Sequence, residues 1–209
     1  METTDLLERC YPGRRAETKR HILRCALNLF NTHGVDATTI DIIRAESQTS
    51  VGSIYHHFGN KEGVVAALYL AALEDQMSLR ERYISEVSST QGWVYALVHS
   101  YVDWVVHQPD WARFQYQARH AVAQSAFADQ LKEANSARNA QMRDWFSDPD
   151  HQRDLKDLPR ELVPSLIIGA AESYCRAWLS ARVKQSPAVH RQLLAEAAWL
   201  AVGHAAARK

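Results

Sequence analysis

The stretch from Thr38 to Val64, TTIDIIRAESQTSVGSIYHHFGNKEGV, limits the possible folds more than any other part of the chain. Capping residues at Thr38, Thr39 and Ser50 predict two short helices, with a tight turn at Gln48-Thr49 between them. Helices shorter than about 12–15 residues are marginal when isolated in water, so both need close neighbours. Two short helices joined by a tight turn form a helix-turn-helix unit.

The second short helix, expected from Ser50 to Phe58, has an unusual outward face. Ile54 and Phe58 are four residues apart and are predicted to point inward, which leaves tyrosine, histidine and small hydroxyl residues outside. Such side chains suit hydrogen bonds to phosphates and base edges. We therefore expect DNA contacts from Thr38, Thr39, Ser50, Val51, Gly52, Ser53, Tyr55, His56, His57 and Lys61. Titration of His56 and His57 predicts that binding changes across about pH 6–7.

Net charge is formally zero, so the positive charge that attracts DNA has to be local. Residues 1–15 are polar, contain Pro12-Gly13 and end in Arg14-Arg15, which predicts a mobile basic arm. Lys19 and Arg20 follow on the next helix. Such an arm can contact phosphates or enter a minor groove. The alternative is a solvated, frayed terminus.

The 209 residues show neither a signal-peptide core nor an apolar run of about eighteen residues, so we expect no membrane association. Cys10, Cys25 and Cys175 are an odd, scattered set. This pattern predicts free thiols in a reducing cytoplasm, and leaves a redox role for any of them open.

Helical periodicity covers most of the remaining chain. It predicts helices over 16–33, 61–85, about 93–108, 110–117, 127–146, 160–184 and 188–206, with a surface loop at DPDHQRDLKDLP, residues 148–159. Pro164 is expected to mark the start of its helix or to bend it. The wide apolar faces of the last two helices suit packing against a second copy of the chain or against its own core.

The motif residues of this stretch resemble the N-terminal domain of the TetR family of transcriptional regulators over residues 16–65. The residues that carry the resemblance are Gly34, Thr38-Thr39, Ile43, Gly52 to Phe58 and Lys61-Glu62. Arg44 stands where the family often has a small residue, and Gln48-Thr49 replaces a Gly-Val pair, which affects the expected turn geometry.

The resemblance implies an all-α homodimer that binds double-stranded DNA at a palindromic operator and is released by a small-molecule effector. The expected division is a basic arm (1–15), a helix-turn-helix domain (16–60) and a C-terminal ligand-binding and dimerisation domain (61–209). Dimerisation is expected through the last two helices. The alternative within this fold is a regulator without a small ligand.

Aromatic residues are frequent in the second half, and pockets for apolar or aromatic ligands are often lined by them. The expected pocket residues are Trp93, Tyr101, Trp104, Trp111, Phe114, Tyr174 and Trp178. The alternative is that most of them are ordinary core.

Enzyme motifs such as a phosphate-binding glycine loop, a nucleophile elbow or a zinc-protease helix do not occur. We therefore expect no catalytic residues and no cofactor. His99, Asp103 and His107 share one helix face at intervals of four, so a metal protein is the remaining alternative.

Overall fold

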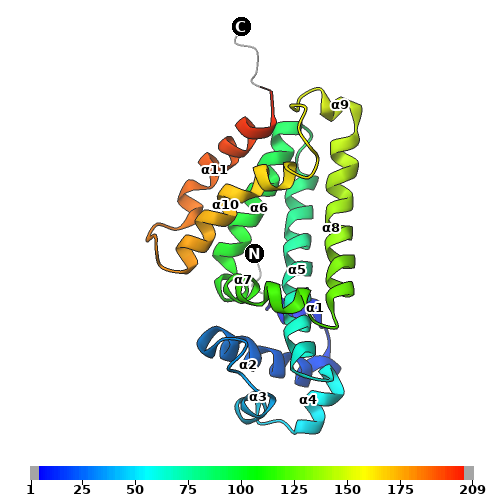
Figure 1. The fold of residues 1–209 in the computed structure, drawn as a ribbon, viewed down its shortest axis with the longest axis vertical. Coiled ribbons are helices and arrows are strands. Elements are labelled where there is room, and N and C mark those ends of the chain that lie inside the picture. Colours follow the sequence, from blue (N-terminus) through cyan, green and yellow to red (C-terminus); the bar gives the residue numbers. More distant parts are fainter. Residues whose placement is uncertain (1–4, 205–209) are drawn as a thin grey trace. The chain divides into compact units, whose positions relative to one another are not determined.

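The computed structural model describes residues 5–204, without the side chains of residues 137–139 and 141. This part of the chain is all-α, as predicted, with one isolated bridge between Leu155 and Gly203. The elements are shown in Figure 1: α1 (Leu6–Cys10), η1 (Arg14–Ala16), α2 (Glu17–His33), α3 (Ile40–Ser47), α4 (Val51–Phe58), α5 (Lys61–Ser85), α6 (Thr90–His107), α7 (Pro109–Ala123), α8 (Ala128–Ser147), α9 (Pro149–Gln152), α10 (Val163–Leu179) and α11 (Pro187–Val202).

Two compact units divide the chain differently from the predicted domains. The first unit comprises residues 1–75 and 110–136, and the second comprises residues 76–109 and 137–209. The predicted boundary at residue 60 therefore falls inside the first unit. Helices α5 and α8 each contribute residues to both units, so two of the changes of unit occur within continuous helices, where no loop or proline signals them. The third change falls at Pro109, at the start of α7.

The first unit is built around the apolar stripes of α2, α3 and α4. Ile22, Leu23, Phe30, Ile43 and Ile54 are fully buried, and α3 packs on both α2 and α4. This burial supplies the stability that the two short helices lack alone.

Residues 5–15 are not the mobile arm that their composition predicts. Asp5 caps α1, and Leu6 and Leu7 are buried, so the segment has an apolar anchor. Arg9 forms hydrogen bonds to Asp75 at 2.6 and 2.9 Å, and the Tyr11 hydroxyl donates to the Ala67 carbonyl at 3.3 Å. This segment is therefore packed along α5. Residues 1–4 of the predicted arm lie outside the described residues.

The second unit packs α6, α10 and α11 against one another (Figure 1). A polar network crosses its interior: the Asp103 carboxylate on α6 accepts hydrogen bonds from Tyr83 and from Arg191 of α11. Burial and the hydrogen bond to Asp103 raise the pKa of Tyr83 to about 12. The network ties α5, α6 and α11 together.

Several element boundaries differ from the sequence prediction, and helix α7, which extends to Ala123, is longer than predicted. The predicted surface loop at 148–159 contains the short helix α9, which Asp148 caps. Helix α10 is shorter than predicted, because Pro164 lies in its first turn and Ala181 adopts a positive φ of 57° just after its end. Helix α11 ends at Val202, where the Lys156 ammonium group donates to the carbonyls of Leu200 and Ala201. No helix in residues 5–204 is long and apolar enough to cross a membrane.

Candidate nucleic-acid interface

The turn between α3 and α4 is fixed by local hydrogen bonds. Gln48 adopts a left-handed conformation with φ 51° and ψ 30°, which ends α3. The Ser50 hydroxyl then caps α4 by accepting a hydrogen bond from the N–H of Ser53 at 3.0 Å. The buried Ser47 hydroxyl donates to the Ile43 carbonyl at 2.7 Å and lies 2.8 Å from the Thr49 hydroxyl. The direction of α4 is therefore set by side chains from both sides of the turn.

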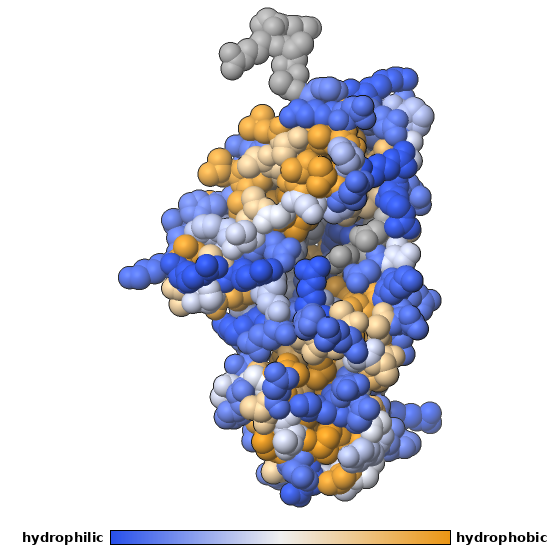
Figure 2. All heavy atoms as spheres, in the orientation of Figure 1, coloured by the Kyte–Doolittle hydropathy of each residue, from blue (hydrophilic) through white to orange (hydrophobic). Residues whose placement is uncertain are grey.

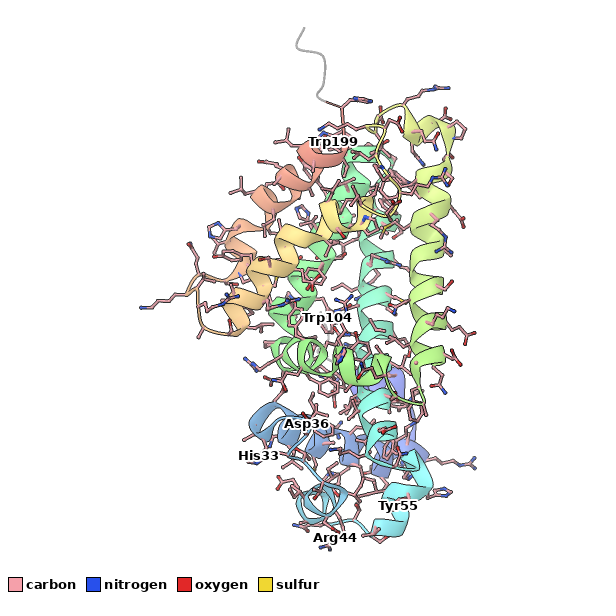
Figure 3. All side chains as sticks on the ribbon, in the orientation of Figure 1. His33, Asp36, Arg44, Tyr55, Trp104 and Trp199 are labelled. Atoms are coloured by element: carbon pink, nitrogen blue, oxygen red, sulfur yellow. The ribbon has the colours of Figure 1, made fainter. Side chains whose placement is uncertain are left out.

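Helix α4 presents much of its predicted face to solvent. Ser50, Val51, Gly52, Tyr55 and His56 are exposed, while Ser53 and His57 are half-buried. Figure 3 shows Tyr55 on α4 and Arg44 on α3 on the outer side of the helix-turn-helix unit. The inward pair, Ile54 and Phe58, is buried as predicted.

The two threonines before α3 have different environments. Thr38 is fully buried and its hydroxyl donates to the Gly34 carbonyl at 2.8 Å, so the predicted DNA contact from Thr38 is wrong for this conformation. Thr39 is exposed and caps α3 by accepting from the N–H of Ile42. Only Thr39 of this pair remains a candidate for a phosphate contact.

Lys61, at the first position of α5, is half-buried. Its ammonium group donates to the carbonyls of Val35 and Asp36 at 3.1 and 3.4 Å, and so fixes the loop between α2 and α3. An ammonium group has three donors, so one remains for a phosphate oxygen. The structure thus gives Lys61 a role within the fold that its position in the sequence did not reveal.

The basic residues around this surface are only partly free. Arg20 donates to the carbonyls of Tyr11 and Gly13, each at 2.7 Å. The Lys19 ammonium group lies 4.0 Å from the Tyr11 ring centroid and 5.9 Å from that of Phe58, which places the start of α2 beside the end of α4. Arg14 and Arg15 are exposed on η1. These two arginines are therefore the better candidates for phosphate contacts.

Burial, together with the charges of His56 and Lys19, lowers the pKa of His57. Its ring lies 5.2 Å from the His56 ring and 5.9 Å from the Phe58 ring, between centroids. His57 is therefore mainly neutral at pH 7, and its titration falls below its ordinary value of about 6.5.

Two exposed residues, one on α3 and one in the turn after it, were missed by the sequence analysis. Ile42 on α3 is exposed although Ile43 is buried, and Gln48 is exposed in the left-handed turn. The exposure of Ile42 could have been predicted from the sequence. Ile40 and Ile43 are three residues apart and share the inward face of the helix, which Ile42 cannot share.

The seven aromatic residues predicted to line a pocket are divided between the two units. Trp111 and Phe114 are buried in the first unit, where Phe114 stacks on Phe30. Trp93 and Trp104 are buried in the second unit, and the Trp93 ring stacks on Trp145 at 4.2 Å between centroids. The Tyr174 hydroxyl donates to the Gln185 carbonyl, and Tyr101 and Trp178 are half-buried.

A pocket of about 580 Å³ in the second unit has a different lining from the predicted one. Its apolar part comes from α8, the segment between α9 and α10, the first turn of α10, and the end of α11. The apolar residues are Met142, Phe146, Leu155, Leu158, Val163, Pro164 and Val202, and the charged residues are Arg143, Lys156, Asp157, Arg160 and Glu161. Both charge signs occur at this pocket, so its charge alone does not select a ligand.

Two residues of the metal-site alternative have other partners within the protein. The Asp103 carboxylate is engaged by Tyr83 and Arg191, and His107 Nδ1 lies 2.6 Å from the Asp103 backbone carbonyl. No group of three or more metal-binding side chains occurs within the described residues. The cysteines are equally poor redox candidates, because burial raises the pKa of the Cys10 and Cys175 thiols to about 12, and also raises that of Cys25.

Residues 22–68 match the family model described as bacterial regulatory proteins, tetR family. Among curated proteins, the chain is 30% identical over 125 residues to the HTH-type transcriptional repressor KstR2 from Rhodococcus jostii, an alignment that covers 59% of each chain. The curated relatives are matched over 39% to 59% of their own lengths.

Solved structures share the fold over most of the chain. A TetR family transcription regulator from Marinobacter aquaeolei has a TM-score of 0.76 at 17% identity, covering 91% of this chain and 98% of its own. FadR from Bacillus subtilis, solved in complex with stearoyl-CoA, has a TM-score of 0.69 at 12% identity, covering 86% and 97%. At these identities the likeness shows the fold alone.

Proposed function

We infer from the match of residues 22–68 to the TetR family model that the chain belongs to this family and is a DNA-binding transcriptional regulator. The observation that supports this most strongly is the exposed face of α4, where Val51, Tyr55 and His56 stand outside a buried Ile54–Phe58 pair. The second helix of a helix-turn-helix unit lies in the major groove, while phosphate contacts beside it fix its register. Thr39, Arg14, Arg15 and Lys61 would make those contacts.

We propose that two copies act together on a palindrome. Leu193 and Leu200 of α11 are 63% and 66% exposed. Three further apolar side chains at α10 and α11 are also exposed, namely those of Leu162, Leu166 and Val189. Figure 2 shows apolar residues gathered over α10 and α11. A second copy would cover this surface in a two-fold, four-helix arrangement. The two α4 helices would then enter successive major grooves about 34–36 Å apart.

We propose that a small-molecule effector binds in the second unit. The pocket of about 580 Å³ in the second unit has the size and apolar lining of a small-molecule site. Stearoyl-CoA binds a protein of the same fold, which favours an effector with a large apolar part. We propose that the chain is a cytoplasmic repressor and that effector binding releases it from DNA. The effector has to bind the two states with different affinity.

The experiment that tests the function is selection of DNA from a random duplex library with the full chain. We expect a palindrome with half-site centres one helical turn apart. If the selection enriches no sequence at all, the proposal is overturned. Lys61→Ala should then flatten the salt dependence of operator binding by about one unit if Lys61 holds a phosphate. An unchanged slope would leave Lys61 with its role in the fold alone.

A thermal-shift screen separates the ligand-responsive regulator from one without a small ligand. A true effector raises the melting temperature by mass action, and Val202→Trp, which fills the pocket, should remove that shift. A compound that stabilises the chain and does not weaken operator binding would contradict the release mechanism.

A further inference from the structure

We propose that Val51 is a specificity-determining residue that recognises the C5 methyl group of a thymine in each operator half-site. The first observation is where large apolar side chains are left exposed. Among the residues that the structure describes, the exposed large apolar side chains of the first unit are those of Ile42, Val51 and Tyr55, which are 39%, 38% and 51% exposed. All three lie on α3 or α4, whereas the remaining exposed ones lie at α10 and α11.

The polar side chains beside Val51 are partly engaged within the protein. The Ser50 oxygen accepts the capping hydrogen bond of α4, and the Thr49 hydroxyl is paired with that of Ser47. Ser53 is half-buried, and Gly52 has no side chain. Val51 is the first residue of α4, so its two methyl groups project at the end of the helix that reaches base edges in helix-turn-helix proteins.

Helix α4 also lacks the side chains that make paired hydrogen bonds to bases. Its sequence, VGSIYHHF, contains no arginine, lysine, asparagine or glutamine, which recognise guanine or adenine in this way. The major groove offers one apolar group, the C5 methyl of thymine. An exposed valine at the reading end of such a helix therefore favours thymine over every other base.

This inference rests on the proposed function, because it needs an operator on which α4 is docked. Removing one methyl group from an apolar contact costs about 0.8 kcal/mol, which is about a fourfold change in affinity. Replacement of the recognised thymine by deoxyuridine removes only that methyl group. We expect about fourfold weaker binding for one half-site and about sixteenfold for both.

The experiment measures fluorescence anisotropy at fixed salt on the selected operator, with each thymine replaced in turn by deoxyuridine. One symmetry-related thymine pair should be sensitive, and thymines elsewhere in the duplex serve as controls. Val51→Ala should weaken binding to the thymine operator and lose the thymine-to-uracil difference at that pair. Ile42→Ala is the matched control and should keep the difference. Melting curves of both variants check that they remain folded.

Three outcomes would overturn the inference while leaving the proposed function standing. They are an operator with no sensitive thymine, a Val51→Ala variant that keeps the full thymine-to-uracil difference, and loss of that difference in Ile42→Ala alone. Failure of the chain to select any sequence would instead overturn the proposed function, and the inference with it.

Discussion

Gly52 lies in the first turn of α4 and Gly63 lies in the first turn of α5, and the surroundings of the two glycines differ. A Cβ atom at Gly63 would stand 1.9 Å from the Phe58 carbonyl oxygen, so the start of α5 can approach the end of α4 only with glycine there. A Cβ atom at Gly52 would meet nothing closer than the Ser50 hydroxyl at 3.8 Å. The protein itself therefore requires glycine at 63 and not at 52, which is consistent with the proposed close approach of DNA at Gly52.

Substitution of each glycine by alanine tests this difference. Gly63→Ala should lower the free energy of unfolding by about 1–3 kcal/mol, the usual cost of overpacking. Gly52→Ala should leave it unchanged or raise it by up to about 1 kcal/mol, because alanine favours the helix. Urea unfolding followed by circular dichroism measures both, and equal midpoints would contradict the close approach at Gly63.

His57 should make DNA binding and stability respond to pH in opposite directions. Its pKa is lowered in the folded chain, so below about pH 6.5 the unfolded chain binds more protons and stability falls as the pH falls. DNA phosphates favour the charged imidazole, so operator affinity should rise over the same range. His57→Gln should flatten both profiles at constant ionic strength. An affinity that is independent of pH in the wild type would rule out this role.

At the scale of helices, α1 is an integral part of the first unit. Leu7→Ala should lower the free energy of unfolding by about 2–5 kcal/mol, because Leu7 is fully buried. Glu8→Ala, the exposed neighbour in the same helix, should change it by no more than about 0.5 kcal/mol. If the two variants unfold at the same urea concentration, α1 is not docked in solution.

The helices that were predicted well are those with local signals at their ends. Thr39 caps α3, Ser50 caps α4 and Gly34 ends α2, and each signal lies in the sequence beside the boundary that it fixes. Helix α1 was missed because it depends on Arg9–Asp75 and Tyr11–Ala67 contacts, whose partners are distant in sequence. Periodicity over so few residues could not reveal them.

Within the candidate site, too, contacts between residues that are distant in sequence could not be predicted. The exposed face of α4 could be predicted, because Ile54 and Phe58 determine which residues of the helix lie inside. It could not separate Thr38 from Thr39, since both can cap a helix and only the fold buries one. Nor could it place the aromatic residues, because spacing along one helix does not say which unit another helix joins.

At the scale of the whole molecule, the exposed apolar surface of α10 and α11 predicts a dimer. Leu193→Glu should shift sedimentation toward the monomer, because it places a charge in an apolar contact. It should also weaken operator binding, since a monomer reads one half-site. Gln124→Glu, at an exposed position after α7, adds the same charge elsewhere and should remain dimeric. A dimeric Leu193→Glu would place the interface on another surface.

The proposed function requires that α4 reads a base sequence. Its most direct measurement is the ratio of dissociation constants for a scrambled duplex and the selected operator, at one salt concentration. The expected ratio for the wild type is about 10³ or more, with a large fall in the double variant Val51→Ala/Tyr55→Ala. A wild-type ratio near one, or a ratio that the double variant leaves unchanged, would contradict the claim.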